Sequence, residues 1–188
     1  VQTGLGRTGE WFGFQHAGIV PDVVTMAKGL GNGVPIGAVW ATADVAAAFG
    51  PGDHGSTFAG QPLAAAGARE VLRIMEEMDA PRKARERGAE LTALLEAIPG
   101  VSSVRGLGLL LGVELDPATL TGRTAGEVAR ACLDAGLVVN GVTPTALRLA
   151  PPMTISSDEL VEGVGILASV LADGSASDDG TTESGGHS

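Results

Sequence analysis

The sequence is poor in several residue types, and each shortage excludes a class of protein. A single cysteine, Cys132, leaves no intrachain disulfide possible in 188 residues and is typical of a reducing cytoplasm. There is no tyrosine, and aromatic residues make up 3% of the chain, so the stacking platforms of single-strand nucleic-acid binders are missing. The formal net charge of −10 argues against a phosphate-backbone partner. No apolar run reaches the roughly 18 residues of a membrane span. We therefore expect a cytoplasmic protein without nucleic-acid or membrane partners.

Hydrophobic periodicity divides the first half of the chain into short strands and long helices. Residues 22–27 and 35–41 are apolar, β-branched runs bounded by Gly and Pro, which predicts two buried strands. Apolar residues recur every three or four positions over 62–78 and again over 81–97, which predicts two helices. The Pro-Gly pair at 99–100 ends the second helix.

The second half has the pattern of a compact α+β unit. Two capping boxes, each a Thr or Ser followed three residues later by Glu, predict helices that begin after Thr124 and Ser156. The predicted order after residue 79 is α-β-β-α-β-β-α. The four strands of that order are expected at 101–104, 109–115, 137–140 and 146–150.

Lys28 is the residue whose chemistry most needs an explanation. The chain has two lysines against ten arginines, and Lys28 lies between a predicted strand and a glycine-rich loop. Desolvation lowers the pKa of a lysine, and the neutral amine can then attack a carbonyl to form a Schiff base. Glycines at 29, 31 and 33 would leave room there for a bulky planar aldehyde. The alternative is a lysine that extends to water from a strand end, as expected for Lys83 on its charged helical face.

The other glycine-rich segments carry no nucleotide-binding signature. Residues 29–33 and 105–112 both lack the G-x-G-x-x-G spacing and the P-loop Lys-Ser/Thr pair. The segment HGSTFAG, residues 54–60, also differs from the G-x-S-x-G of serine hydrolases. It offers hydroxyl and backbone N–H groups to an anion such as phosphate, and a plain helix-capping turn is the alternative. With three histidines and no Cys-x-x-Cys or His-Glu-x-x-His motif, we expect no metal site.

Several motifs, taken in order and spacing, resemble the second half of the class III aminotransferases, which are pyridoxal-phosphate enzymes of fold type I. The resemblance covers about residues 1–172 and rests on VQTGLGRTGEWF, PDVVTMAKGLGNGVPIGAV, HGSTFAGQPLA, VRGLGLLLGVEL and LRLAPPMTIS. It implies an α/β fold: the end of a large mixed-sheet domain followed by a small C-terminal α+β domain. The implied parts are the C-terminal part of the cofactor-binding large domain (1–61), an interdomain helix (62–78), the small domain (79–173) and a disordered acidic tail (174–188).

The resemblance also implies which residues would contact the cofactor, pyridoxal 5'-phosphate. Lys28 would be the catalytic Schiff-base lysine, a role that arginine cannot take because its guanidinium does not give up a proton near neutral pH. Gln2 would hydrogen-bond the phenolic oxygen of the cofactor, and Val1 would pack on its pyridine ring. Thr57 would reach the cofactor phosphate of the partner subunit in a homodimer.

Two further residues would bind substrate by the same resemblance. Arg148 would bind the substrate α-carboxylate, for which the guanidinium fork is well shaped; by itself, this arginine could equally be a surface residue at a strand edge. Ser56 would lie near the substrate. The wording of the GRTG and AKGLGNGVPIGAV segments is most like members that transfer the amine of N2-acetylornithine to 2-oxoglutarate, a step of arginine biosynthesis.

The family pattern includes features that would come before the first residue of this resemblance. The aspartate that pairs with the pyridine nitrogen would come before Val1, as would a glycine-bearing phosphate loop, so we expect the chain to be a C-terminal fragment. Two alternatives remain open. One is a class III aminotransferase for ornithine, 4-aminobutyrate or a similar amine. The other is a truncated, non-catalytic module for dimerisation or interaction.

Overall fold

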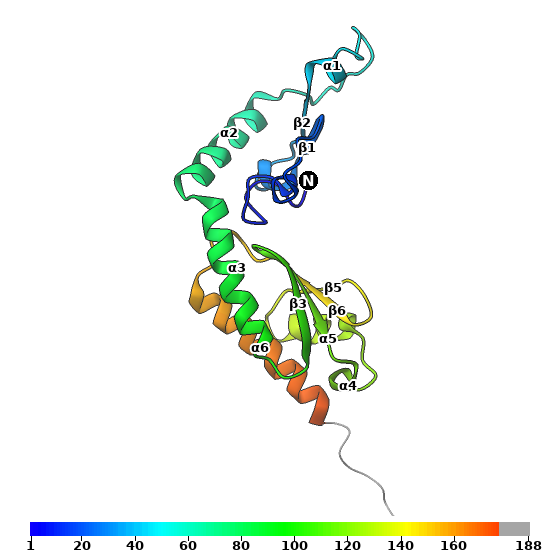
Figure 1. Ribbon diagram of the computed structural model, residues 1–188, viewed down its shortest axis with the longest axis vertical. Coiled ribbons are helices and arrows are strands. Elements are labelled where there is room, and N and C mark those ends of the chain that lie inside the picture. Colours follow the sequence, from blue (N-terminus) through cyan, green and yellow to red (C-terminus); the bar gives the residue numbers. More distant parts are fainter. Residues whose placement is uncertain (177–188) are drawn as a thin grey trace, which may run out of the picture. The chain divides into compact units, whose positions relative to one another are not determined.

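The computed structural model describes residues 1–176, which form two compact units (Figure 1). The first unit contains Val1–Glu86 and Leu107–Leu109, and the second contains Arg87–Gly106 and the residues from Leu110 onward. The domain limits inferred from the sequence stay a prediction. None of the helices among the described residues is both long and apolar enough to cross a membrane.

The first unit is built from a two-stranded sheet, short helical turns and the long helix α2. In chain order its elements are η1 (Gly13–Ala17), β1 (Val23–Met26), η2 (Lys28–Leu30), β2 (Ala38–Ala41), α1 (Ala43–Ala46), α2 (Pro62–Glu77) and the beginning of α3 (Ala80–Glu96). Pro62 stands in the first turn of α2, where its missing N–H costs no hydrogen bond. On the inner side of α2, Ala68 and Met75 are buried.

The prediction that residues 22–27 and 35–41 form buried strands was right about strands and wrong about burial. β1 pairs antiparallel with β2, with Val24 opposite Trp40. Val39 is 70% exposed and Trp40 is 49% exposed. The apolar composition indicated burial, but a ribbon of two strands has no neighbouring strand or helix layer, within residues 1–176, that could cover both of its faces.

The second unit packs three longer helices against a four-stranded sheet. Its elements are the rest of α3, β3 (Val101–Leu107), β4 (Leu110–Leu115), α4 (Pro117–Leu120), α5 (Ala125–Asp134), β5 (Asn140–Gly141), β6 (Ala146–Leu149) and α6 (Ser157–Ala176). The strand order is β3-β4-β6-β5, and β6 pairs antiparallel with both β4 and β5. The short helix α4, capped by the Asp116 side chain, was not predicted.

The predicted strand 137–140 was largely wrong, because only its last residue joins the sheet. The N–H of Leu137 donates to the carbonyl of Cys132 at 2.8 Å and so closes the C-terminus of α5. That bond uses a donor which a strand would have needed. Val138 is 81% exposed, and pairing begins only at Asn140, opposite Arg148.

Alternation along β4 separates a buried face of the second unit's sheet from an exposed face. Leu111, Val113 and Leu115 are buried, whereas Gly112 and Glu114 lie on the other face. The buried face packs on apolar side chains of the helices. The largest fully buried side chains of this core are Leu91, Leu95, Val113, Leu115, Val128, Cys132, Leu147, Leu167 and Leu171. Burial raises the pKa of the Cys132 thiol, which makes this cysteine a packing residue.

Both predicted capping boxes are present. The side chain of Thr124 accepts a hydrogen bond from the N–H of Glu127, whose carboxylate accepts from the N–H of Thr124. In the same way the Glu159 carboxylate accepts from the N–H of Ser156 at 2.7 Å. Helix α6 continues to Ala176, so the expected tail, 174–188, begins as helix, and its remainder lies outside the described residues.

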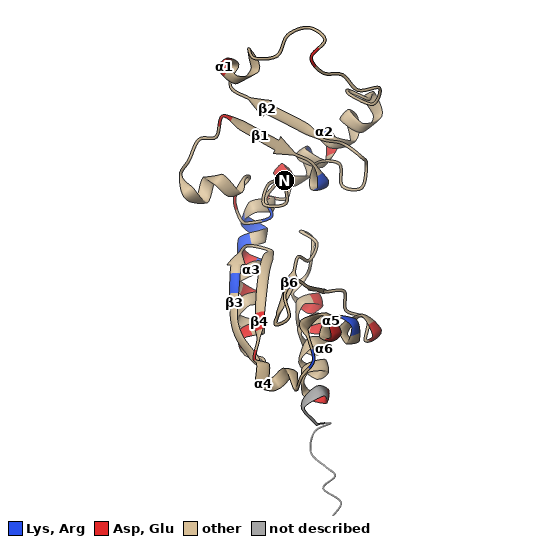
Figure 2. Cartoon of the chain, turned by 90° about the vertical axis from the view of Figure 1, so that its right-hand side faces the viewer, with Lys and Arg blue, Asp and Glu red and all other residues tan. Residues whose placement is uncertain are grey.

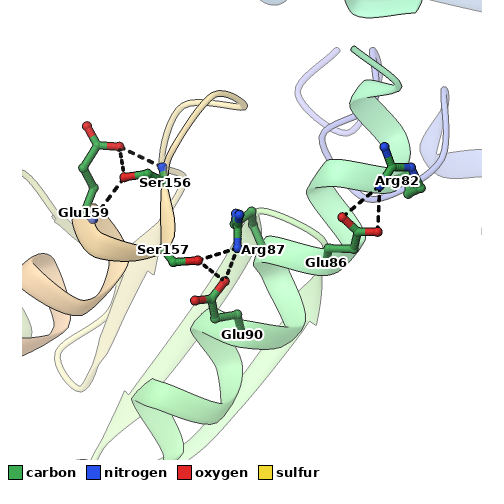
Figure 3. Close-up of polar contacts among 7 residues, drawn as sticks. All are labelled: Arg82, Glu86, Arg87, Glu90, Ser156, Ser157 and Glu159. Atoms are coloured by element: carbon green, nitrogen blue, oxygen red, sulfur yellow. Dashed lines mark hydrogen bonds and ion pairs between the residues drawn. The ribbon is translucent and has the colours of Figure 1, made fainter.

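Ion pairs follow the exposed side of α3, where residues of both signs alternate (Figure 2). The Arg82 guanidinium donates to Glu86 at 2.9 Å, and Arg87 lies between Glu90, at 2.5 Å, and Ser157, at 2.6 Å (Figure 3). Exposed pairs of this kind contribute little to stability, because water and salt screen them. The contact of Arg87 with Ser157 matters more for position, because it ties α3 to the first turn of α6 within the second unit.

Truncating one core leucine should destabilise the second unit strongly. Leu147 is fully buried on β6, so Leu147→Ala should lower the free energy of unfolding by about 3 kcal/mol through lost burial and a residual cavity. Leu133→Ala is the matched control, because Leu133 is 57% exposed on α5; it should cost less than about 1 kcal/mol. Urea unfolding followed by circular dichroism measures both, and equal losses would contradict this account of the core.

The capping box of α6 should make stability depend on acid. Hydrogen bonds from the Ser156 backbone and hydroxyl lower the pKa of Glu159 below its ordinary 4.5. A lowered folded-state pKa gives stability that is present above the unfolded value and is lost as pH falls through the folded one. Glu159→Gln keeps the side-chain shape without the charge, so its urea midpoint should fall less than that of the wild type below about pH 4.5. Glu162→Gln, on the same helix, is the control and should keep the wild-type acid dependence.

Candidate active site

Lys28 occupies the point where β1 turns into η2, with a backbone conformation that is unusual for a side-chain-bearing residue. Its φ is 52°, in the left-handed region, which costs a non-glycine residue about 1–2 kcal/mol. Two backbone hydrogen bonds fix the turn: Leu30 N–H to the Ala27 carbonyl and Gly31 N–H to the Lys28 carbonyl, both at 3.1 Å. The Lys28 side chain is exposed. Strained, well-fixed residues of this kind are typical of functional sites.

The glycine loop after Lys28 is only partly open. A Cβ at Gly31 would overlap the carbonyl oxygen of Val34, so this glycine is needed by the loop itself. A Cβ at Gly33 would meet nothing within 4 Å, and one at Gly29 would meet only Cδ1 of Leu5, at 3.7 Å. Gly29 and Gly33 therefore have room beside their Cα atoms, whereas Gly31 serves the fold of the loop.

The N-terminal loop packs against this turn and carries two of the predicted cofactor residues. Val1 is half exposed and lines a cavity of about 220 Å³ together with Thr25 and Met26 of β1. Met26 is two residues before Lys28 in the sequence. Gln2 is half-buried in the same loop. Within the first unit, Val1 therefore lies beside β1, the strand that precedes Lys28.

A pair of backbone contacts far apart in sequence holds the N-terminal loop in place. Leu109 N–H donates to the carbonyl of Arg7 at 2.9 Å, and Nη1 of Arg7 donates to the carbonyl of Leu109 at 3.1 Å. Gly108 has a φ of 54°, and a Cβ there would lie 2.6 Å from the carbonyl carbon of Thr8. Burial lowers the pKa of Arg7, although its guanidinium stays charged. Local sequence gave no signal for this contact, because 102 residues separate its partners.

Ser56 and Thr57 lie in an exposed turn ahead of α2. The Ser56 hydroxyl oxygen accepts from the N–H of Phe58 at 3.2 Å, and its carbonyl accepts from the N–H of Ala59, also at 3.2 Å. The hydroxyl hydrogen of Ser56 thus remains available as a donor. Among residues 1–176, no hydrogen bond or ion pair joins Ser56 or Thr57 to Lys28.

Arg148 lies in the second unit, on the exposed face of β6. Its neighbours in register are Gly112 on β4 and Asn140 on β5. Within the described part of the chain its side chain has no hydrogen bond or ion pair, so its five N–H donors are available to a ligand. Five of the six predicted site residues thus belong to the first unit, and Arg148 belongs to the second.

The chemistry of these donors fits pyridoxal phosphate. Lys28 supplies an exposed primary amine, Ser56 and Thr57 supply hydroxyls that suit a phosphate, and Gln2 supplies an amide for a phenolic oxygen. Over residues 1–176, no group of three His, Cys, Asp or Glu side chains could hold a metal ion. The arrangement is thus one of a nucleophilic amine with neutral hydrogen-bonding groups.

A model of the class-III aminotransferase family matches residues 1–171. The chain belongs to this family. It is 48% identical over 174 residues to the acetylornithine aminotransferase of Corynebacterium efficiens, an alignment that covers 92% of this chain and 42% of that protein. It is 44% identical to the acetylornithine aminotransferase of Streptococcus mutans, over 91% of this chain and 45% of the relative. The chain therefore spans less than half the length of the curated relatives it matches.

Two solved aminotransferase structures have the same fold over most of this chain. The acetylornithine aminotransferase of Elizabethkingia anophelis superposes with a TM-score of 0.79 at 30% identity, covering 92% of this chain and 44% of that one. The ornithine delta-aminotransferase of Plasmodium falciparum superposes with a TM-score of 0.82 at 34% identity, covering 94% and 46%. The fold class inferred from the sequence is confirmed.

Adding a side chain at Gly108 should loosen the N-terminal loop. Gly108→Ala places a Cβ against Thr8 at a left-handed residue, so the free energy of unfolding should fall by about 1–3 kcal/mol. The amide of Leu109, which donates to Arg7, should exchange faster with solvent deuterium. Gly165→Ala, in open space on α6, is the control and should be neutral or stabilise by up to about 1 kcal/mol. Unchanged protection of Leu109 in Gly108→Ala would show that the contact does not hold the loop.

Proposed function

We propose that this chain acts in the pyridoxal-phosphate-dependent transamination of N2-acetylornithine with 2-oxoglutarate, which gives N-acetylglutamate 5-semialdehyde and glutamate. The observation that carries the proposal is Lys28, an exposed amine fixed at the end of β1 in a strained conformation, within a chain of this family. The relatives of 44–48% identity described above are acetylornithine aminotransferases, which supports the choice of amino donor.

In this proposal Lys28 has two tasks. Its Nζ would hold the cofactor, and the same amine, when free and neutral, would accept a proton from the amine-bearing carbon of the donor. The bound cofactor supplies an electron sink for the pair left on that carbon. The left-handed backbone and two hydrogen bonds fix the base of the Lys28 side chain, and its flexible four-carbon stem lets the amine move between the two tasks. Gln2 and Val1 orient the cofactor ring.

Arg148 recognises the carboxylate in the proposed reaction. Its guanidinium can take a carboxylate in a bidentate pair, which fixes direction as well as charge. No carboxylate of the described chain competes for it. N-Acetylornithine and 2-oxoglutarate both carry an α-carboxylate, so one arginine serves both halves of the reaction.

The oligomer is part of the same proposal. Thr57 and Ser56 lie in an exposed turn beside Phe58, which is 78% exposed. A turn with an uncovered aromatic residue is suited to contact with a second subunit. We infer a homodimer in which Thr57 donates to the cofactor phosphate of the partner.

Ornithine is the second candidate for the amino donor. The superposition on the ornithine delta-aminotransferase of Plasmodium falciparum is as good as that on the acetylornithine enzyme of Elizabethkingia anophelis, with TM-scores of 0.82 and 0.79. The two donors differ only at the α-nitrogen. N-Acetylornithine carries a neutral amide there, whereas ornithine carries a charged ammonium group. Half-reactions with each donor separate the two candidates.

The experiment tests Lys28 directly. The purified chain is mixed with pyridoxal phosphate, its visible spectrum is recorded, and the sample is reduced with borohydride and mapped by peptide mass spectrometry. The expected result is a bound-cofactor absorbance and a reduced label on Lys28, both lost in Lys28→Ala because no other amine lies in the glycine loop. Lys83→Ala, which removes the other lysine from a charged helical face, should keep both.

The outcome against the proposal is equally definite. Label on Lys83 alone, or no label, would mean that this chain does not form the cofactor site and would favour a non-catalytic interaction module. If Lys28 is labelled and the chain consumes ornithine but not N-acetylornithine, ornithine is the amino donor.

A further inference from the structure

Three strands bring one arginine and one amide together on the exposed face of the second unit's sheet. Arg148 on β6 is directly opposite Asn140 on β5 and Gly112 on β4. Directly opposed residues of antiparallel strands have Cβ atoms about 4.5–5.5 Å apart and point to the same face. Both Asn140 and Arg148 are exposed, whereas the alternate residue Leu147 is fully buried. The amide is therefore a fixed neighbour of the guanidinium.

The other charged groups on this face are already paired with each other. Nη1 of Arg105 donates to Glu114 at 3.0 Å, and the other carboxylate oxygen of Glu114 accepts from the hydroxyl of Thr145. These hydrogen bonds, first that of Thr145 and then that of Arg105, lower the pKa of Glu114, so the pair stays ionised and neutral overall. Arg148 is thus the cation of this face that remains available to a ligand.

The two flanks of Arg148 differ in their neighbours. On the β4 side Gly112 has no side chain of its own, and the Arg105 side chain covers it, with Cγ 3.6 Å and Nε 3.7 Å from where a Cβ would stand. On the β5 side the Asn140 amide offers two N–H donors. A carboxylate held by both donors of the guanidinium fork still has lone pairs free, and the amide can use one of them.

We propose that Asn140 is a substrate-binding residue, whose side-chain N–H donates a hydrogen bond to the carboxylate held by Arg148. This inference rests on the proposed role of Arg148 and adds a specificity element to it. A neutral amide at this position favours a carboxylate without cancelling the charge of the arginine, as an aspartate would.

The test uses binding alone, without cofactor. The 15N-labelled full chain is titrated with 2-oxoglutarate, and the resonances of the Asn140 side-chain amide and of the Arg148 Nε–H are followed by NMR. We expect both to shift and to saturate together. Asn140→Ala should weaken binding about fivefold, the effect of one hydrogen bond to a charged group at an exposed site, and Asn140→Asp should weaken it more than about tenfold by repulsion.

Ser102→Asp is the matched control, because it adds the same charge at an exposed position of β3 in the same sheet; it should leave binding unchanged. Unchanged amide resonances of the core residues Val113 and Leu147 show that each variant is folded. A stationary Asn140 amide, or an Asn140→Ala variant that binds as well as the wild type, overturns the inference. If neither the Asn140 nor the Arg148 resonance shifts, the proposed carboxylate-binding roles of both residues are wrong. The proposed cofactor site is tested separately, by the reduced label on Lys28.

Discussion

The exchange of hydrogen bonds between Arg7 and Leu109 is the constraint on which the geometry around Lys28 depends. It closes a loop of about a hundred residues, and Gly108 allows the two backbones to approach because no Cβ stands between them. The N-terminal loop that this contact holds begins with Val1 and Gln2. Its Leu5 lies beside Gly29, where a Cβ would be 3.7 Å from Cδ1 of the leucine. Without these hydrogen bonds, the turn at Lys28 would be held mainly by the two-stranded sheet of β1 and β2.

The two units obtain their stability in different ways. The second unit has a closed apolar core, with leucines of α3 and α6 packed on the buried face of the sheet, and both of its capped helices satisfy their first N–H groups. The first unit leaves much of its apolar surface uncovered, Val20 being 89% exposed and Val39 70%. It buries a smaller set of apolar residues, which includes Leu5, Leu30 and Leu109, and specific backbone contacts add to that burial. Local opening should therefore be easier near the ribbon than in the helical core.

Sequence reasoning was strongest where the structural cause is local. The helices over 62–78 and 81–97 and the two capping boxes were predicted nearly to the residue, because periodicity and capping involve neighbours three or four positions apart. Lys28 was singled out from its setting, and the structure adds the left-handed backbone that no composition indicates. The assigned roles of the six site residues stay predictions.

The errors share one physical origin, which is dependence on distant parts of the chain. Apolar runs at 22–27 and 35–41 indicated buried strands, yet burial requires a neighbouring layer and not only composition. The strand predicted at 137–140 lost its donor to the end of α5. The pairing of Asn140 with Arg148 depends on sheet register, which eight residues of sequence do not reveal.

The left-handed backbone of Lys28 affects which substitutions this position would accept if catalysis were no longer selected. Glycine adopts a φ of 52° without strain, so replacing this lysine by glycine would relax the turn at the same time as it removes the amine. An inactive descendant of this chain could thus be more stable than its active ancestor. Retention of lysine here works against the preference of the backbone, and a copy released from selection for catalysis would be free to lose it first.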